Sequence, residues 1–114
     1  MKTSKLTGKA LRWAVVQIEC TKPVVIGTST LKVFNYANAP KFFSPEMNWA
    51  HGGVIIEREG IEICPIGNGE WRGQLDVAGD LIRFYGDTPL IAAMRCYVAS
   101  KLGDEVEIPE ELNV

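Results

Sequence analysis

The chain has 114 residues, of which 46% are hydrophobic and 23% charged, and its formal net charge is −2. This size and composition predict a single globular domain over residues 1–114, and the acidic balance disfavours nucleic acid as a partner. The apolar runs are too short to span a membrane and the N-terminus lacks the features of a signal peptide, so we expect a cytoplasmic protein.

The first expected element is a helix over about residues 7–19. Ser4 or Thr7 can cap its start, and apolar residues recur at helical spacing at Ala10, Trp13, Ala14 and Ile18. The one local basic patch that would suit a nucleic acid lies in and before this helix, at Lys2, Lys5, Lys9 and Arg12.

Two strands are expected next, at Val24–Ile26 and Leu31–Phe34, because both runs are rich in β-branched or aromatic residues. Residues 36–45 then read as a loop that places Phe42 and Phe43 at the surface.

The stretch "SPEMNWAHGGVIIEREGI" permits two interpretations. It can form two strands with a turn at Gly60, or a helix over residues 48–59 with Asn48 as N-cap and Gly60 just past the end. Local propensity favours the strands, because Gly52 and Gly53 would each cost a helix about 1 kcal/mol relative to alanine.

The remaining elements have clear signals. A hairpin is expected over residues 61–77 with its turn at Gly67-Asn68-Gly69, and "GDLIRFYG" predicts a further strand. A final helix spans Leu90–Leu102, with Asp87 or Thr88 as N-cap and Pro89 in the first turn. It is apolar on almost all sides, which is typical of a buried central helix.

The sequence offers little for a metal or a cofactor. A closed zinc site would need Cys20, Cys64, Cys96 and His51 to converge, and we expect three reduced, buried thiols instead. Glu57, Glu59 and Glu62 belong to a charged run that we expect to be solvated. No phosphate-binding loop or dinucleotide fingerprint is present, so we expect no cofactor and no metal.

Catalysis also has weak support. His51 is the only histidine and the obvious general base, with Ser44, Glu46 or Glu57 as partners. No nucleophile elbow or paired-carboxylate pattern accompanies it, and the alternative is an exposed polar residue in the first turn of a helix. We therefore favour a protein that is not an enzyme and assign no catalytic residue.

Binding residues are easier to nominate. Arg95 interrupts an apolar helix and must form a salt bridge, point at an edge or face an anion. Trp49 and Trp71 either stack on a base or pack in the core. The Gly52-Gly53 pair would let another helix, a subunit or a ligand approach closely.

Three segments, "LTGKALRWAV", "FSPEMNWAHGGVIIEREGI" and "TPLIAAMRCYVASKLGDEVEIPEEL", together resemble the NinX-like proteins encoded by lambdoid phages and enterobacterial prophages. The order of elements is similar to that of the phage α–β–α sandwich domain, which implies a helix at residues 48–59, and we adopt that helix. The chain departs from the family at Val54, where the family usually has proline. The family brings no established activity, and the resemblance implies an accessory phage protein acting in the bacterial host cell.

We therefore expect an α+β fold, in which a mostly antiparallel sheet of about three to five strands packs with two or three helices. The first functional hypothesis is a non-catalytic protein that sequesters a small anionic, nucleotide-derived ligand such as a host-defence signal. Its site residues would be Ser44, Asn48, Trp49, His51, Gly52, Gly53 and Arg95. The alternatives are a protein-binding inhibitor or adaptor of a host enzyme, using Phe42, Phe43 and the acidic tail, and a small nucleotide hydrolase using His51 with Glu46 or Glu57. A homo-oligomer is expected in addition.

Overall fold

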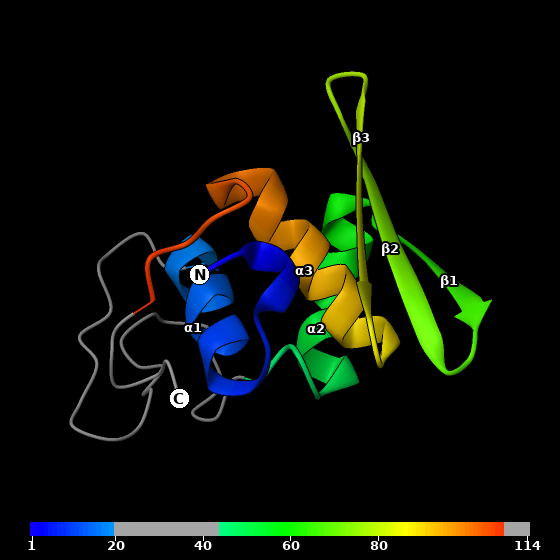
Figure 1. Ribbon diagram of the computed structural model, residues 1–114, viewed down its shortest axis with the longest axis horizontal. Coiled ribbons are helices and arrows are strands. Elements are labelled where there is room, and N and C mark those ends of the chain that lie inside the picture. Colours follow the sequence, from blue (N-terminus) through cyan, green and yellow to red (C-terminus); the bar gives the residue numbers. More distant parts are fainter. Residues whose placement is uncertain (20–43, 109–114) are drawn as a thin grey trace.

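The structure, a computed structural model, describes residues 1–19 and 44–108 (Figure 1). The expected strands at Val24–Ile26 and Leu31–Phe34, and the Phe42-Phe43 pair, lie outside these residues. In the described part of the chain, helices pack against an antiparallel sheet, which confirms the α+β fold. No helix in this part is long and apolar enough to cross a membrane.

The N-terminal helix is confirmed as α1, Gly8–Glu19, and follows a short 3-10 turn, η1, at Thr3–Lys5. Of the apolar residues whose spacing predicted the helix, Ala10 and Ala14 are buried and Trp13 and Ile18 are half-buried. The other buried residues of the helix are Leu11, Val15 and Val16. The side-chain hydroxyl of Thr3, in η1, donates to the carbonyl of Gly103 at 2.7 Å. The start of the chain is thereby joined to the end of the last helix.

The segment with two interpretations is a helix, α2, at Trp49–Glu59. The Asn48 side chain accepts a hydrogen bond from the Ala50 amide at 2.8 Å, and Gly60 ends the helix in the left-handed conformation at φ 72°. The helix forms although Gly52 and Gly53 disfavour it, because Ile55 is buried and Gly52 packs where a larger residue would collide. Tertiary packing outweighs local propensity here.

The sheet has three strands in the order β1-β2-β3: β1 at Glu62–Gly67, β2 at Glu70–Val77 and β3 at Asp80–Gly86. Both neighbouring pairs are antiparallel. The predicted Gly67-Asn68-Gly69 turn joins the first pair, with all three residues at positive φ. Ala78-Gly79, also at positive φ, joins the second pair, so the predicted hairpin and the further strand are both confirmed.

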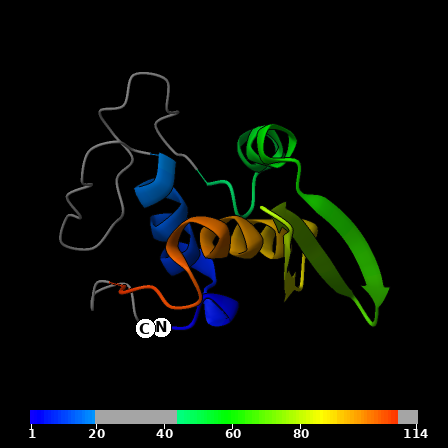
Figure 2. The same cartoon turned by 90° about the horizontal axis from the view of Figure 1, so that it is seen from above.

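The last helix, α3, spans Pro89–Leu102, with Thr88 as its N-cap accepting from the Ile91 amide at 3.1 Å. It lies across one face of the sheet, and α2 and η1 lie on opposite sides of it (Figure 2). The sheet approaches α3 closely at Gly73, where an added Cβ would lie 2.7 Å from the Ala92 carbonyl oxygen. The core is built around α3, whose buried residues include Met94, Cys96, Tyr97 and Val98.

Candidate functional site

The N-terminal end of α2 brings together most of the predicted site residues. The Ser44 amide donates to Nδ1 of His51 at 2.9 Å, so the incoming loop is tied to the first turn of the helix. His51 is half-buried rather than exposed, and Asn48 is exposed although its side chain caps the helix. Ser44, Asn48 and His51 thus each have a local structural contact.

The two glycines of α2 differ in their surroundings. At Gly52 an added Cβ would lie 2.4 Å from the carbonyl oxygen of Pro45 and 2.6 Å from Cδ2 of Leu90. At Gly53 the nearest atom would be Cε3 of Trp49, at 4.0 Å. Gly52 is therefore required for packing against the loop and α3, whereas Gly53 leaves room for the Trp49 ring beside the helix.

Three exposed apolar side chains lie just before α2 and in its first six residues. Met47, Trp49 and Val54 are 69%, 54% and 62% exposed. These are the three most exposed large apolar side chains in residues 1–19 and 44–108. We call Met47, Trp49 and Val54 the 47–54 surface. Large apolar side chains exposed this close together in the chain are candidates for an interaction site.

Glu46 lies in the loop before α2 and is 5% exposed. Its carboxylate accepts from Nε and Nη2 of Arg12 at 3.1 and 2.8 Å, which ties α1 to the loop before α2. From the sequence, Glu46 is a candidate partner for His51 and Arg12 is part of a basic patch. The two side chains pair with each other instead, because a buried carboxylate needs a cation.

Arg95 lies apart from the other predicted site residues. Its Nε donates to the Leu6 carbonyl at 2.7 Å and its Nη1 donates to the Tyr85 carbonyl at 2.6 Å. Leu6 follows η1 and Tyr85 lies in β3, whereas α2 is on the other side of α3 (Figure 2). Burial lowers the pKa of Arg95, and the nearby Asp87 opposes that shift. Within the described residues it forms no ion pair, so the expected salt bridge is replaced by backbone carbonyls.

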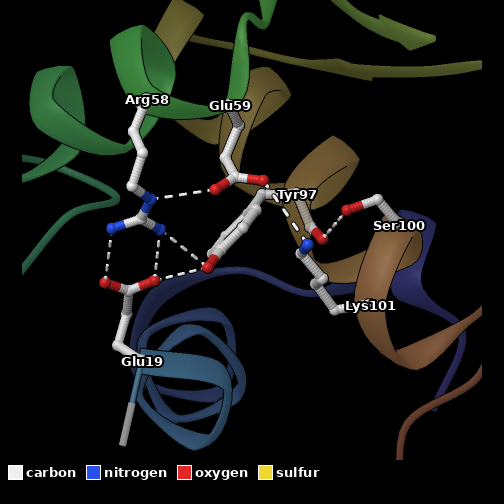
Figure 3. Close-up of polar contacts among 6 residues, drawn as sticks. All are labelled: Glu19, Arg58, Glu59, Tyr97, Ser100 and Lys101. Atoms are coloured by element: carbon white, nitrogen blue, oxygen red, sulfur yellow. Dashed lines mark hydrogen bonds and ion pairs between the residues drawn. The ribbon is translucent and has the colours of Figure 1, made fainter. Parts of the chain in front are cut away.

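A polar cluster that sequence analysis did not find joins the three helices (Figure 3). Arg58 of α2 donates from Nη1 and Nη2 to the two carboxylate oxygens of Glu19 in α1, at 3.1 and 2.6 Å. The Tyr97 hydroxyl of α3 donates to Glu19 and accepts from Arg58. Glu59 accepts from Arg58 at 2.9 Å and pairs with Lys101 at 3.5 Å. We call these five residues the helix clamp.

The pKa values in the helix clamp are shifted in different directions. The hydrogen bond from Arg58 lowers the pKa of Glu59. Burial, followed by the hydrogen bond to Glu19, raises the pKa of Tyr97. Hydrogen bonds to Glu19 and Glu59 raise the pKa of Arg58. A tyrosine inside an otherwise apolar helix was the sequence signal for this cluster, because a buried hydroxyl needs a partner.

Within residues 1–19 and 44–108, no group of three or more His, Cys, Asp or Glu side chains could hold a metal ion. Cys20 lies outside those ranges. Cys96 is buried as expected, and burial raises the pKa of its thiol to about 12. Cys64 is half-exposed, which corrects the expectation that it is buried. Trp71 is also half-exposed, on a strand that packs against α3.

Comparison with known proteins identifies one family. The family model described as "Bacteriophage P22, NinX" matches residues 2–101. A search of curated proteins finds no match.

Proposed function

The chain belongs to the bacteriophage P22 NinX family, and we propose that it is a non-catalytic accessory protein that inserts the 47–54 surface into an apolar groove of a host protein. The observation that carries this proposal is the exposure of Met47, Trp49 and Val54, just before α2 and in its first half. Amphipathic helices commonly bind partners by placing apolar side chains in a groove. A phage accessory protein would meet this partner in the cytoplasm of the infected bacterium.

The local contacts support a rigid binding surface. Asn48 caps α2, His51 accepts from the loop and the Arg12–Glu46 pair anchors that loop. Nη2 of Arg12 also lies 3.4 Å from the Met47 sulfur, so this exposed side chain has a partner inside the protein. A surface that is ordered before binding loses less conformational entropy when the complex forms.

A substitution in the 47–54 surface tests the proposal. Immobilised wild-type protein should retain a defined protein from a lysate of the host bacterium, and Val54→Glu should lose it, because a charge would be buried in an apolar groove. Ile66→Glu is the matched control, since Ile66 is 43% exposed and lies in β1. Both variants should keep the wild-type circular dichroism spectrum. Retention of the same protein by Val54→Glu would refute this surface as the contact.

A small anionic, nucleotide-derived ligand at the same end of α2 is the second candidate. One observation favours it: the Trp49 ring is half-exposed and lies beside Gly53, where no side chain obstructs it. An exposed indole can stack on a base, and Ser44 and Asn48 lie nearby in the chain. Arg95 is on another side of α3, so any phosphate contact at this end of α2 would have to come from a different residue.

Thermal unfolding in the presence of nucleotides, cyclic nucleotides and ADP-ribose derivatives separates the two candidates. A ligand at about 100 times its Kd should stabilise the fold by about 2.7 kcal/mol, a shift in Tm on the order of 10 °C for a domain of this size. The shift should vanish in Trp49→Ala and persist in Arg95→Lys. A flat panel would eliminate this candidate and leave the protein partner.

A further inference from the structure

The two edges of the sheet differ in how well they are protected. The β1 edge contains Pro65, and its register with β2 shifts between Pro65 and Gly67. The β3 edge has no proline and pairs with β2 in continuous register from Asp80 to Gly86. Proline and bulges are the devices by which natural sheets block the addition of another strand. Only β1 carries them, and β3 is the strand nearer to η1 (Figure 1).

At one end of the β3 edge, a side chain of the same protein already occupies the backbone hydrogen-bonding position. Nη1 of Arg95 donates to the Tyr85 carbonyl, so the backbone of Tyr85 faces away from β2. Antiparallel pairing alternates along a strand, and Leu81 and Arg83 therefore direct their backbone groups to the same free edge. No backbone hydrogen bond from outside the sheet reaches Leu81 or Arg83 within the described chain. The open part of the edge is therefore Leu81 to Arg83.

A cavity of about 320 Å³ lies beside this edge, where η1, β3 and the segment after α3 meet. Phe84 forms its apolar wall, and the polar lining comes from Lys2, Ser4, Asp104 and Glu105. A strand added to β3 would point every second side chain toward the face of the sheet that carries Phe84. Two carboxylates against one ammonium favour a cationic side chain in this cavity.

The opposite face of β3 supplies a second chemical requirement. Leu81 and Tyr85 are 53% and 46% exposed and flank Arg83, which is also exposed and whose Nε donates to Oε1 of Gln74 in β2 at 2.6 Å. A partner strand should therefore place an acidic residue opposite Arg83, with an apolar residue opposite Leu81. A second copy of this chain fits poorly, because antiparallel self-pairing centred on Arg83 would set two arginines against each other.

We propose that β3 accepts an extended strand of another protein, which has an acidic residue facing Arg83 and a neighbouring lysine or arginine entering the cavity at Phe84. Main-chain hydrogen bonds to Leu81 and Arg83 hold the added strand. The acidic residue facing Arg83 and the basic residue in the cavity determine which peptide sequences bind. This site lies on other elements than the 47–54 surface. A test of strand binding at β3 is therefore independent of a test of the proposed function.

A capped seven-residue peptide provides the probe. It carries glutamate at the fourth position, lysine at the third, valine at the second and sixth, and threonine elsewhere, so antiparallel pairing of the glutamate with Arg83 places the lysine opposite Phe84. Titration into isotope-labelled protein should shift the amide resonances of Leu81 and Arg83 and leave those of Trp49 and Val54 in place. Arg83→Glu should weaken binding by roughly tenfold, or about 1.4 kcal/mol, and a peptide with lysine at the fourth position should restore it.

Two controls keep the result decisive even if Arg83→Glu disturbs the sheet. A peptide methylated at the backbone nitrogens that face β3 should not bind the unaltered protein, because its donors are removed. Ile66→Glu, in β1, should bind the peptide as the wild type does. Equal binding of the methylated peptide, resonance shifts confined to α2, or no shift at millimolar peptide would overturn the proposal. Self-association of the wild type that Arg83→Glu abolishes would also overturn it, in favour of a second copy.

Discussion

At the scale of single residues, the adjacent glycines of α2 show that identical residue types can have different roles. Gly52 lies against the Pro45 carbonyl and Leu90, while Gly53 has only the Trp49 ring near it. In the sequence the two glycines look alike, as a pair beside which a neighbour can approach closely. For Gly52 the structure shows that the neighbour is this chain's own loop and helix α3.

This contrast leads to a prediction on stability. Gly52→Ala should lower the free energy of unfolding by about 1–3 kcal/mol, because a backbone carbonyl 2.4 Å from the new Cβ has to move. Gly53→Ala should raise it by about 0.5–1 kcal/mol, because alanine favours the helix and meets only an ordinary contact. Urea unfolding of both variants provides the measurement. Equal changes in the two variants would show that the Pro45 contact does not constrain α2.

At the scale of elements, the sequence predicts a helix or strand well when the residues that define it are neighbours in the chain. The Gly67-Asn68-Gly69 turn, the Thr88 cap with Pro89, and the apolar spacing in α1 each lie within a few residues of the element they define. The helix α2 is different. Its propensity favours strands, and what stabilises it is Ile55 in the core and Gly52 against α3, which are contacts with distant parts of the chain. The family resemblance predicted this helix, and propensity did not.

The candidate site was harder to predict than the fold for the same reason. Sequence analysis could nominate Trp49 and Arg95 from their chemistry, but not their positions relative to each other. Arg95 contacts Leu6 and Tyr85 on one side of α3, and α2 packs on another side. The Arg12–Glu46 pair was missed because its members are far apart in the sequence and each resembles an ordinary surface charge. Binding at the predicted site residues stays a prediction for all of them: Ser44, Asn48, Trp49, His51, Gly52, Gly53 and Arg95.

At the scale of the whole molecule, the helix clamp joins the C-terminal ends of α1 and α2 to α3 (Figure 3). Its charged members are partly exposed, and side chains of this kind contribute modestly to stability when taken singly. Tyr97 is 2% exposed and sits between Glu19 and Arg58, so the cluster is anchored in the core. Its titration therefore connects the stability of the molecule to pH.

The direction of each pH effect follows from the shifted pKa values. The pKa of Glu59 is lowered from 4.5 in the folded protein, so its contribution is fully present above 4.5 and is lost as the pH falls through the lower folded value. The pKa of Tyr97 is raised from 10.0, so its contribution is fully present below 10.0 and is lost as the pH rises toward the higher folded value. The free energy of unfolding should therefore decline on both the acid and the alkaline side.

Two variants should remove these declines separately. In Glu59→Gln the acid decline should become shallower, because the unfolded and folded states no longer differ in proton binding at this position. In Tyr97→Phe the alkaline decline should become shallower, while stability at neutral pH falls by about 1 kcal/mol from the lost hydrogen bonds. Cys96 also titrates at high pH, since burial raises its pKa from 9.0 to about 12, so both curves are measured against a Cys96→Ala background. Urea midpoints from about pH 3 to 11 give the two slopes. An alkaline decline of unchanged slope in Tyr97→Phe would mean that the Tyr97 hydroxyl does not link folding to pH.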